Sequence, residues 1–311
     1  MAHVKSLAAW LTFPVIFAAQ LGGFAAALKL GFDPGLTLLA VTIANMTVIA
    51  VLELWLPDRP DWSWARDGQV FNDIIHGLGN EFAGGLGRTL LLVIFATIGG
   101  RLAEEGNLGL WPNAWPLWAQ ILVAVLIVDF FDYWKHRAYH GWSFAWPIHA
   151  LHHNMNQMHV FKGIRLHFLE AAIRSLVVYS PLVILGAPAE VMIWIAALMT
   201  FAGSLNHSNL KQELPRFVHA LLPTQKTHWL HHNKEFDRGA CNLSPLTMWC
   251  DHLFGTFRHP LDVELREVGI KPDPIPKNLP AQLASPLIWP FLTWRFKRRA
   301  HVAPDLVETA P

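Results

Sequence analysis

Long apolar stretches restrict what this chain can fold into more than any other feature of its sequence. Four of them lie in its first half, at Leu7–Leu30, Leu36–Leu56, Ala83–Leu102 and Trp115–Phe131. Each is close to the roughly 20 residues that a helix needs to cross a lipid bilayer. Because 53% of the chain is hydrophobic and only 15% is charged, against about a quarter charged in soluble proteins, we predict an all-α integral membrane protein.

A fifth stretch, Ile173–Leu205, is too long for a single span. It is interrupted at Gly186-Ala187-Pro188, and glycine and proline in this arrangement favour a turn. The sequence therefore predicts a helical bundle of about four spans plus a helical hairpin, with six crossings.

The distribution of basic residues predicts the orientation of this bundle. With both termini inside, the outer loops carry only Lys29 and Arg101, whereas the inner segments carry many more, including the run Arg295–Arg299. Lys and Arg near span ends are retained in the cytoplasm. We therefore expect both termini and a histidine-rich helical cap on the cytoplasmic side, and the lack of an appended domain or retrieval signal favours a bacterial inner membrane.

Three regions follow from this organisation. We expect transmembrane helices over residues 1–115, a catalytic region with the histidine motifs over 116–260, and a linker with a tail over 261–311. In the tail, aromatic residues alternate with basic ones between Pro286 and Arg299, a pattern that fits either an interfacial anchor or a solvated tail.

Charge and cysteine content exclude two classes of function. A formal net charge of +1 gives no support for nucleic-acid binding, which requires an excess of Lys and Arg. The two cysteines, Cys241 and Cys250, have neither the number nor the spacing of a disulfide framework or a thiolate metal site.

Histidine is the residue type that points to chemistry. The chain has 17 histidines, and two of them, His136 and His140, are spaced to share one face of a helix that continues the fourth span. An HxxHH motif then occurs twice, and a single histidine stands between the two copies in Asn206-His207-Ser208-Asn209. The nine candidate metal ligands are His136, His140, His149, His152, His153, His207, His228, His231 and His232.

The number of these ligands says more than their type. Imidazole suits iron, zinc, copper and nickel. A structural zinc takes four ligands and a catalytic zinc usually three, so nine imidazoles fit two metal ions with open positions. An accidental histidine-rich surface or a pH-sensing cluster is the alternative, but the repeated spacing favours metal ligation.

At these residues the chain resembles the fatty acid hydroxylase and sterol desaturase superfamily of membrane proteins. The resemblance covers about Asp129 to Phe257 and rests on the histidine motifs, on Arg165-Leu-His-Phe-Leu-Glu170 and on Asp251-His-Leu-Phe-Gly-Thr256. Phe168 replaces a proline that is usual in the family, and Gly203 stands where some members have another histidine.

The resemblance implies a di-iron oxygenase that hydroxylates or desaturates a lipid-like or sterol-like substrate with O2, and zinc can replace iron on purification. Electrons would come from a separate donor, such as a ferredoxin, cytochrome b5 or a reductase. Asp132 and Glu170 are candidates to accept the remaining ring N–H of metal-binding imidazoles, although Asp132 fits a helix-end role equally well.

Two other classes of function stay open on the residues alone. A zinc-dependent membrane hydrolase needs fewer ligands and usually a carboxylate base, and the sequence lacks HExxH. A transporter or a metal-sensing membrane protein should carry polar residues within its spans, whereas these spans are almost wholly apolar. Both classes are therefore disfavoured against the oxygenase.

Overall fold

The computed structural model describes residues 2–105, 110–235, 239–265, 267–271 and 273–302. Within these residues the fold is helical, and its only extended pairings are two isolated bridges, Pro57 with Leu210 and Asn233 with Val268. The long helices are α1 (Ala2–Lys29), α2 (Pro34–Trp55), α3 (Val70–Glu105), α4 (Leu117–Gly141), α6 (Phe168–Leu185) and α7 (Ala189–His207). The short ones are α5 (Trp146–His153), α8 (Arg216–Leu221), α9 (Gln225–His231), α10 (Trp249–Leu253), α11 (Leu279–Ala284), α12 (Trp289–Val302) and two 3-10 turns, η1 (Trp64–Arg66) and η2 (Val160–Ile164).

Five helices among the described residues are long and apolar enough to cross a membrane: α1 from Val4 onward, α2, α4, α6 and α7. The remaining predicted span, Ala83–Leu102, falls within α3. Many side chains in the second half of α3 lie outside the described set, so that crossing stays a prediction. The all-α membrane bundle is confirmed.

The outer surface of this bundle is apolar. On α2, for example, Leu39, Ile43, Val51 and Leu54 are between 51% and 60% exposed. Apolar side chains that cover a whole helix face without protein contact are suited to a lipid environment, where the backbone hydrogen bonds of the helix are satisfied internally.

The helical hairpin forms where the sequence predicts it. α6 ends at Gly186, which has φ +83°, a left-handed conformation that glycine adopts without a Cβ penalty. The N–H of Ala187 then donates to the carbonyl of Leu182 at 2.9 Å, and Pro188 caps the N-terminus of α7. This turn brings α7 back along α6.

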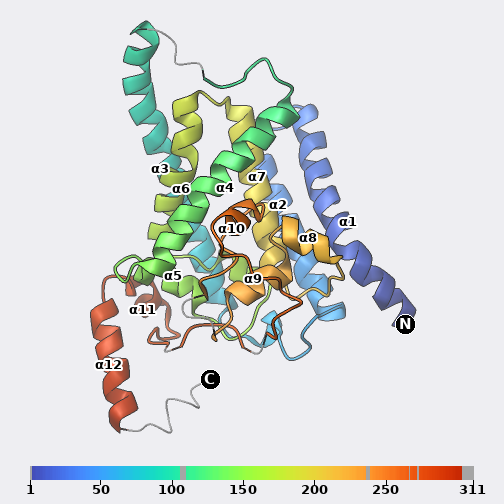
Figure 1. The fold of residues 1–311 in the computed structure, drawn as a ribbon, viewed down its shortest axis with the longest axis vertical. Helices are drawn as coiled ribbons and strands as arrows, with labels where there is room; N and C mark the ends of the chain where they lie inside the picture. The colour runs from blue at the N-terminus through green and yellow to red at the C-terminus, as the bar shows by residue number, and fades with distance from the viewer. Residues whose placement is uncertain (1, 106–109, 236–238, 266, 272, 303–311) are drawn as a thin grey trace.

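The core between α4, α6 and α7 fixes the position of the site. Val128 of α4, Val178 and Leu182 of α6 and Ile195 of α7 are fully buried in one cluster. The C-terminal ends of α4 and α7 and the N-terminal end of α6 consequently lie together, at the end of the bundle where the short helices α5 and α9 pack (Figure 1).

The C-terminal segment also packs on this end of the molecule. Gln282 of α11 is fully buried, and its side chain contacts Gln69, Asn72 and His76 at 3.0–3.3 Å. Residues 273–284 therefore contact the start of α3, whereas α12 continues beyond the bundle (Figure 1).

Candidate metal centre

Helix geometry decides how each HxxHH motif divides its side chains. At 3.6 residues per turn, the first and last histidines of the motif lie about 40° apart around the helix, while the middle one is displaced about 60° to the other side. His149 and His153 of α5 therefore point in one direction and His152 points in another. His228 and His232 are related in the same way, with His231 displaced from both.

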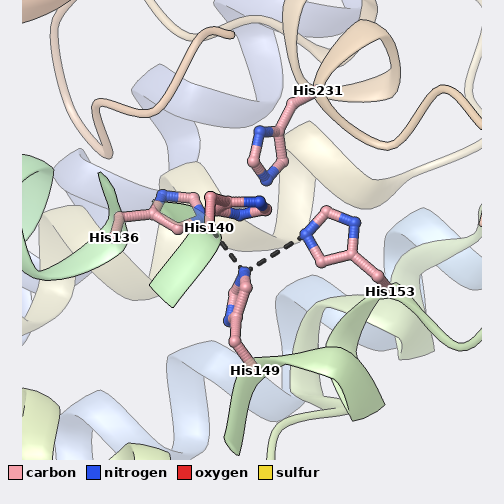
Figure 2. Close-up of side chains that lie close together, drawn as sticks. All are labelled: His136, His140, His149, His153 and His231. Carbon is pink, nitrogen blue, oxygen red and sulfur yellow. Dashed lines mark hydrogen bonds between the residues drawn. The ribbon is translucent and has the colours of Figure 1, made fainter. Parts of the chain in front are cut away.

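The first histidine group combines three helices. It consists of His136 and His140 from α4, His149 and His153 from α5 and His231 from α9, whose candidate ligand atoms all lie within 4.8 Å of one another. Figure 2 shows the five rings directed at a common centre, with Nε2 of His149 3.0 Å from Nε2 of His136 and 3.2 Å from Nε2 of His153. We call this the five-histidine group.

The second group takes the remaining four: His152 from α5, His207 from α7, and His228 and His232 from α9 and its C-cap. Nε2 of His207 lies 3.2 Å from Nε2 of His152 and 2.8 Å from Nε2 of His228. We call this the four-histidine group. The ring centroids of His153 and His232 are 4.2 Å apart, so the two groups are neighbours.

The outward-facing ring nitrogens are held by the protein. Nδ1 of His136 donates to the carbonyl of Leu243 at 2.7 Å, and Nδ1 of His231 donates to the carbonyl of Cys241 at 2.9 Å. Nδ1 of His149 lies 2.8 Å from Oε1 of Glu170. A proton held at Nδ1 leaves the lone pair of Nε2 directed into the group, which is the tautomer that binds a metal ion.

The pair His152–His207 tests whether these residues fit a metal. Nδ1 of His152 bonds to the carbonyl of Arg165 at 3.2 Å, and Nδ1 of His207 to the carbonyl of Gly203 at 2.9 Å. Because a carbonyl can only accept, both protons sit on Nδ1, and two bare Nε2 lone pairs face each other at 3.2 Å. A cation between them removes this repulsion.

Other observations agree with this fit. Nε2 of His231 is buried and has no hydrogen-bond partner among the described residues. Burial lowers the pKa of the group members outside the membrane spans, well below 6.5 for five of them and to about 4 for His231. These imidazoles are therefore neutral, as metal ligands must be.

Glu170 lies beside His149 of the five-histidine group. It is the acidic residue of the first turn of α6, it is 3% exposed, and it bonds to His149. Its second oxygen, Oε2, is buried without a partner among the described residues. The ring of Tyr139 stacks on His149 from another side, with centroids 5.4 Å apart and planes inclined by 13°. Tyr139 is not among the predicted site residues, although its place inside HRAYH was a usable signal.

Among the described residues, Asp132 bonds to two basic side chains and not to a histidine. Its carboxylate accepts a hydrogen bond from Lys135 at 2.7 Å and one from Arg174 at 3.3 Å. Asp132 therefore ties α4 to α6 one turn before His136. In these contacts it acts as an ion-pair partner and not as an acceptor for a ligand imidazole.

A buried charge cluster lies behind the four-histidine group. Lys162 bonds to Asp67 at 2.6 Å and to Asp73 at 2.9 Å, and Arg165 bonds to Asp73 at 2.7 Å. His159 completes the cluster through a 3.2 Å contact with Asp67. Because an ammonium group already occupies both carboxylates, this is an ion-pair cluster and not a third metal site.

The cluster supports the histidines through Arg165. The carbonyl of Arg165 holds His152, and its side chain bonds to the backbone oxygen and to Oδ1 of Asn154, the residue after the first HxxHH. The sequence does not predict this arrangement, because Lys162 is far along the chain from Asp67 and Asp73 and none of the three belongs to a motif.

Comparisons with known proteins agree with this site. The fatty acid hydroxylase family profile matches residues 121–256, which include all nine histidines. The chain is 31% identical over 251 residues to ornithine lipid hydroxylase OlsE of Rhizobium tropici, covering 79% of this chain and 74% of that protein. No solved structure matches the chain.

Two further relatives are more distant. The chain is 28% identical over 150 residues to alkylglycerol monooxygenase of Danio rerio, covering 47% of this chain and 31% of that protein. It is 28% identical over 152 residues to very-long-chain aldehyde decarbonylase GL1-10 of Oryza sativa subsp. japonica, covering 47% and 48% of the two chains. The present chain spans less than half of either protein.

The membrane bundle and its two histidine groups define a metal-dependent, membrane-bound oxidoreductase. This chain belongs to the fatty acid hydroxylase family. The resemblance found in the sequence is thereby confirmed.

Proposed function

We propose that this protein is a di-iron hydroxylase that adds one oxygen atom to a C–H bond of a membrane lipid. The observation that carries the proposal is the division of nine histidines, seven of them buried, into two adjoining groups. Within each group the candidate ligand atoms lie within 4.8 Å of one another. One zinc ion of a hydrolase requires only three or four protein ligands, so a hydrolase leaves more than half of these histidines without a role.

Hydroxylation is favoured over the other reactions of the family by the relatives. Two of the three relatives are named as a hydroxylase and a monooxygenase, and the relative that the chain covers most fully is one of these two. The reaction R–H + O2 + 2 e⁻ + 2 H⁺ → R–OH + H2O requires a donor of two electrons. Bound iron would supply the binding and reductive activation of O2.

The residues of this chain have distinct parts in that reaction. The nine imidazoles would hold two iron ions. Glu170 fixes the tautomer and ring position of His149 through its 2.8 Å contact, and Tyr139 packs against the same ring. The bundle supplies an apolar environment from which a lipid can approach along the exposed helix faces. We place both termini and the histidine groups on the cytoplasmic side, where a soluble electron donor can reach them.

Metal analysis of the two groups separately tests the dinuclear site. We expect about two iron ions per chain in detergent-purified protein expressed with added iron. A His207→Ala variant should retain about one, since the four-histidine group then loses its ligand from α7 and binds its ion too weakly to keep it through purification. A His152→Ala/His231→Ala variant, which removes one ligand from each group, should likewise lose the ion of the four-histidine group and bind that of the five-histidine group more weakly.

A His219→Ala variant is the matched control. His219 is also buried, but it bonds to Thr224 and belongs to neither group, so its metal content should equal that of the parent. One iron ion or fewer in the parent, or equal metal content in all four proteins, contradicts the proposal.

The reaction itself is tested with ¹⁸O2. Iron-loaded protein in detergent is mixed with extracted membrane lipids and a chemical reductant, and the lipids are analysed by mass spectrometry. A hydroxylase incorporates one ¹⁸O atom per product molecule. A product that has lost two hydrogens and gained no oxygen identifies a desaturase instead.

A further inference from the structure

We propose that α12 is the docking site of a soluble, negatively charged electron-carrier protein, and that Trp146 conducts its electrons to the five-histidine group. This inference rests on the proposed function, because only an oxygenase needs such a donor. It names the surface, the chemistry of the partner and the route to the metal site.

Trp146 is the contact between the site and this surface. Its ring centroid lies 5.4 Å from that of His140 and 5.4 Å from that of His153, so it packs against two candidate ligands of one group. The residue is 6% exposed and begins α5, the helix that carries His149, His152 and His153. The ring of Trp146 therefore lies between His140 and His153 and the surface pocket that Trp146 also lines.

On its other side Trp146 borders a surface pocket of about 210 Å³ that α12 lines with Trp289, Phe296 and Lys297. Trp289 also packs against the buried cluster that contains Trp146. Trp146 and α12 thus line the same pocket, and Trp289 packs against the cluster around Trp146. Electron transfer becomes slower with distance, and this proximity makes α12 a suitable point of entry.

The exposed face of α12 has the charge and shape of a docking surface. Arg295, Lys297 and Arg298 are exposed, and no Asp or Glu occurs between residues 277 and 299. Trp294 is 53% exposed, and the guanidinium of Arg298 lies 5.5 Å from its ring centroid. A basic rim around exposed aromatic residues is typical of an interface for an acidic protein.

The direction of α12 favours a soluble partner over the membrane surface. An amphipathic helix that binds lipid lies in the plane of the interface. Instead, α12 extends beyond the end of the bundle that carries α5 and α9 and runs away from the spanning helices (Figure 1). Its basic face is consequently presented to the aqueous phase.

Stopped-flow mixing with a reduced, acidic [2Fe–2S] ferredoxin as the probe tests the docking site. The iron-loaded protein is kept in neutral detergent without anionic lipid, and oxidation of the ferredoxin is followed by its visible absorbance under anaerobic conditions. We expect the second-order rate constant of a Lys297→Glu/Arg298→Glu variant to fall by about tenfold or more at low salt. The parental rate should fall with ionic strength.

A Lys5→Glu/Lys211→Glu variant is the matched control, because it reverses two exposed charges near the N-terminus of α1, away from α12. It should react with ferredoxin like the parent. An α12 variant within about twofold of the parent overturns the proposal. An equal loss in both variants also overturns it, since the effect is then one of total charge.

Reduction by methyl viologen separates this inference from the proposed function. All three proteins should accept electrons from this small reductant at the same rate, since it needs no docking surface. If the parent accepts none, the proposed function fails. If the parent does so but the α12 variant keeps its reactivity towards ferredoxin, only the docking inference fails.

Trp146 is tested by its effect on the limiting rate. At saturating ferredoxin we expect electron transfer to slow in the order parent, Trp146→Phe, Trp146→Leu, with unchanged ferredoxin affinity. Metal content is measured in parallel, and the Phe variant decides the question if the Leu variant loses metal. Limiting rates equal to the parental rate in a metal-replete variant exclude Trp146 as the route.

Discussion

Replacing Lys162 by methionine should destabilise the protein strongly, because it leaves unbalanced charge in the interior. The side chain of Lys162 is 2% exposed, and its ammonium group lies 2.6 Å from Asp67 and 2.9 Å from Asp73, whose side chains are 3% and 0% exposed. The Lys162→Met variant retains two carboxylates and one guanidinium in this cluster, so that one negative charge has no partner.

The expected cost follows from the contacts that remain. Removing one partner of a buried ion pair costs roughly 3–5 kcal/mol. Asp73 keeps its 2.7 Å bond to Arg165, and Asp67 keeps a 2.7 Å bond from Gln157, so we expect about 3 kcal/mol. For a chain of this size that corresponds to a fall in Tm on the order of 10 °C.

A compensating variant distinguishes charge from lost packing. Lys162→Met/Asp67→Asn removes one charge of each sign and leaves the Asp73–Arg165 pair intact, so it should recover at least about half of the lost stability. Lys211→Met is the control, because Lys211 is half exposed and lies 3.8 Å from Glu213. Its effect should stay within about 0.5 kcal/mol.

Equilibrium unfolding in detergent, followed by tryptophan fluorescence, provides the measurement. In the parent, burial by itself raises the pKa of Asp67, but His159 and Lys162 outweigh it and hold that pKa below the usual 3.8. The parental contribution is therefore complete above about pH 4 and is lost only below it. In the Lys162→Met variant Asp67 loses the ammonium group that lowers its pKa and takes up a proton more readily, so the deficit should shrink as the pH falls from about 8 to about 5. A cost below about 1 kcal/mol, or a double variant no more stable than the single one, refutes the reasoning.

Two further predictions concern the site and its surroundings. Glu170→Gln should lower iron affinity by about tenfold, within the 10- to 100-fold range typical of groups that hold a ligand imidazole. Chelator competition measures the affinity, with a variant of an exposed residue, Glu190→Gln, as the control. Unchanged affinity in Glu170→Gln contradicts the role of Glu170. Burial raises the pKa of Cys241 and of Cys250 from 9.0 to about 12, so at pH 8 the folded protein should contain about a thousandfold less thiolate than a free thiol. Both cysteines should therefore react with iodoacetamide only after unfolding, and rapid labelling of the native protein would contradict this.

The sequence determined the spans and the local geometry of the histidines. Apolar length predicts a crossing helix because the bilayer has a fixed thickness, and five predicted crossings correspond to α1, α2, α4, α6 and α7. Glycine followed by proline marked the turn after α6. Helical periodicity likewise predicted that His136 and His140 share a face, as they do in the five-histidine group.

Only the tertiary structure decided which histidines belong together. His152 is next to His153 in sequence, yet it joins His207, which lies on another helix, and His231 joins the group opposite to that of its neighbour His232. Helical periodicity makes neighbouring histidines point in different directions, but the packing of α4, α5, α7 and α9 determines which histidines of other helices each of them meets.

The same reason explains the partners of the charged and aromatic residues. Sequence position placed Asp132 one turn from His136 and three residues before Lys135 on the same helix, but only the packing of α6 against α4 gives it Arg174. Trp146 likewise contacts His140 only because α5 folds back against α4. Local spacing is a property of one helix, whereas these contacts depend on segments that only long-range packing brings together.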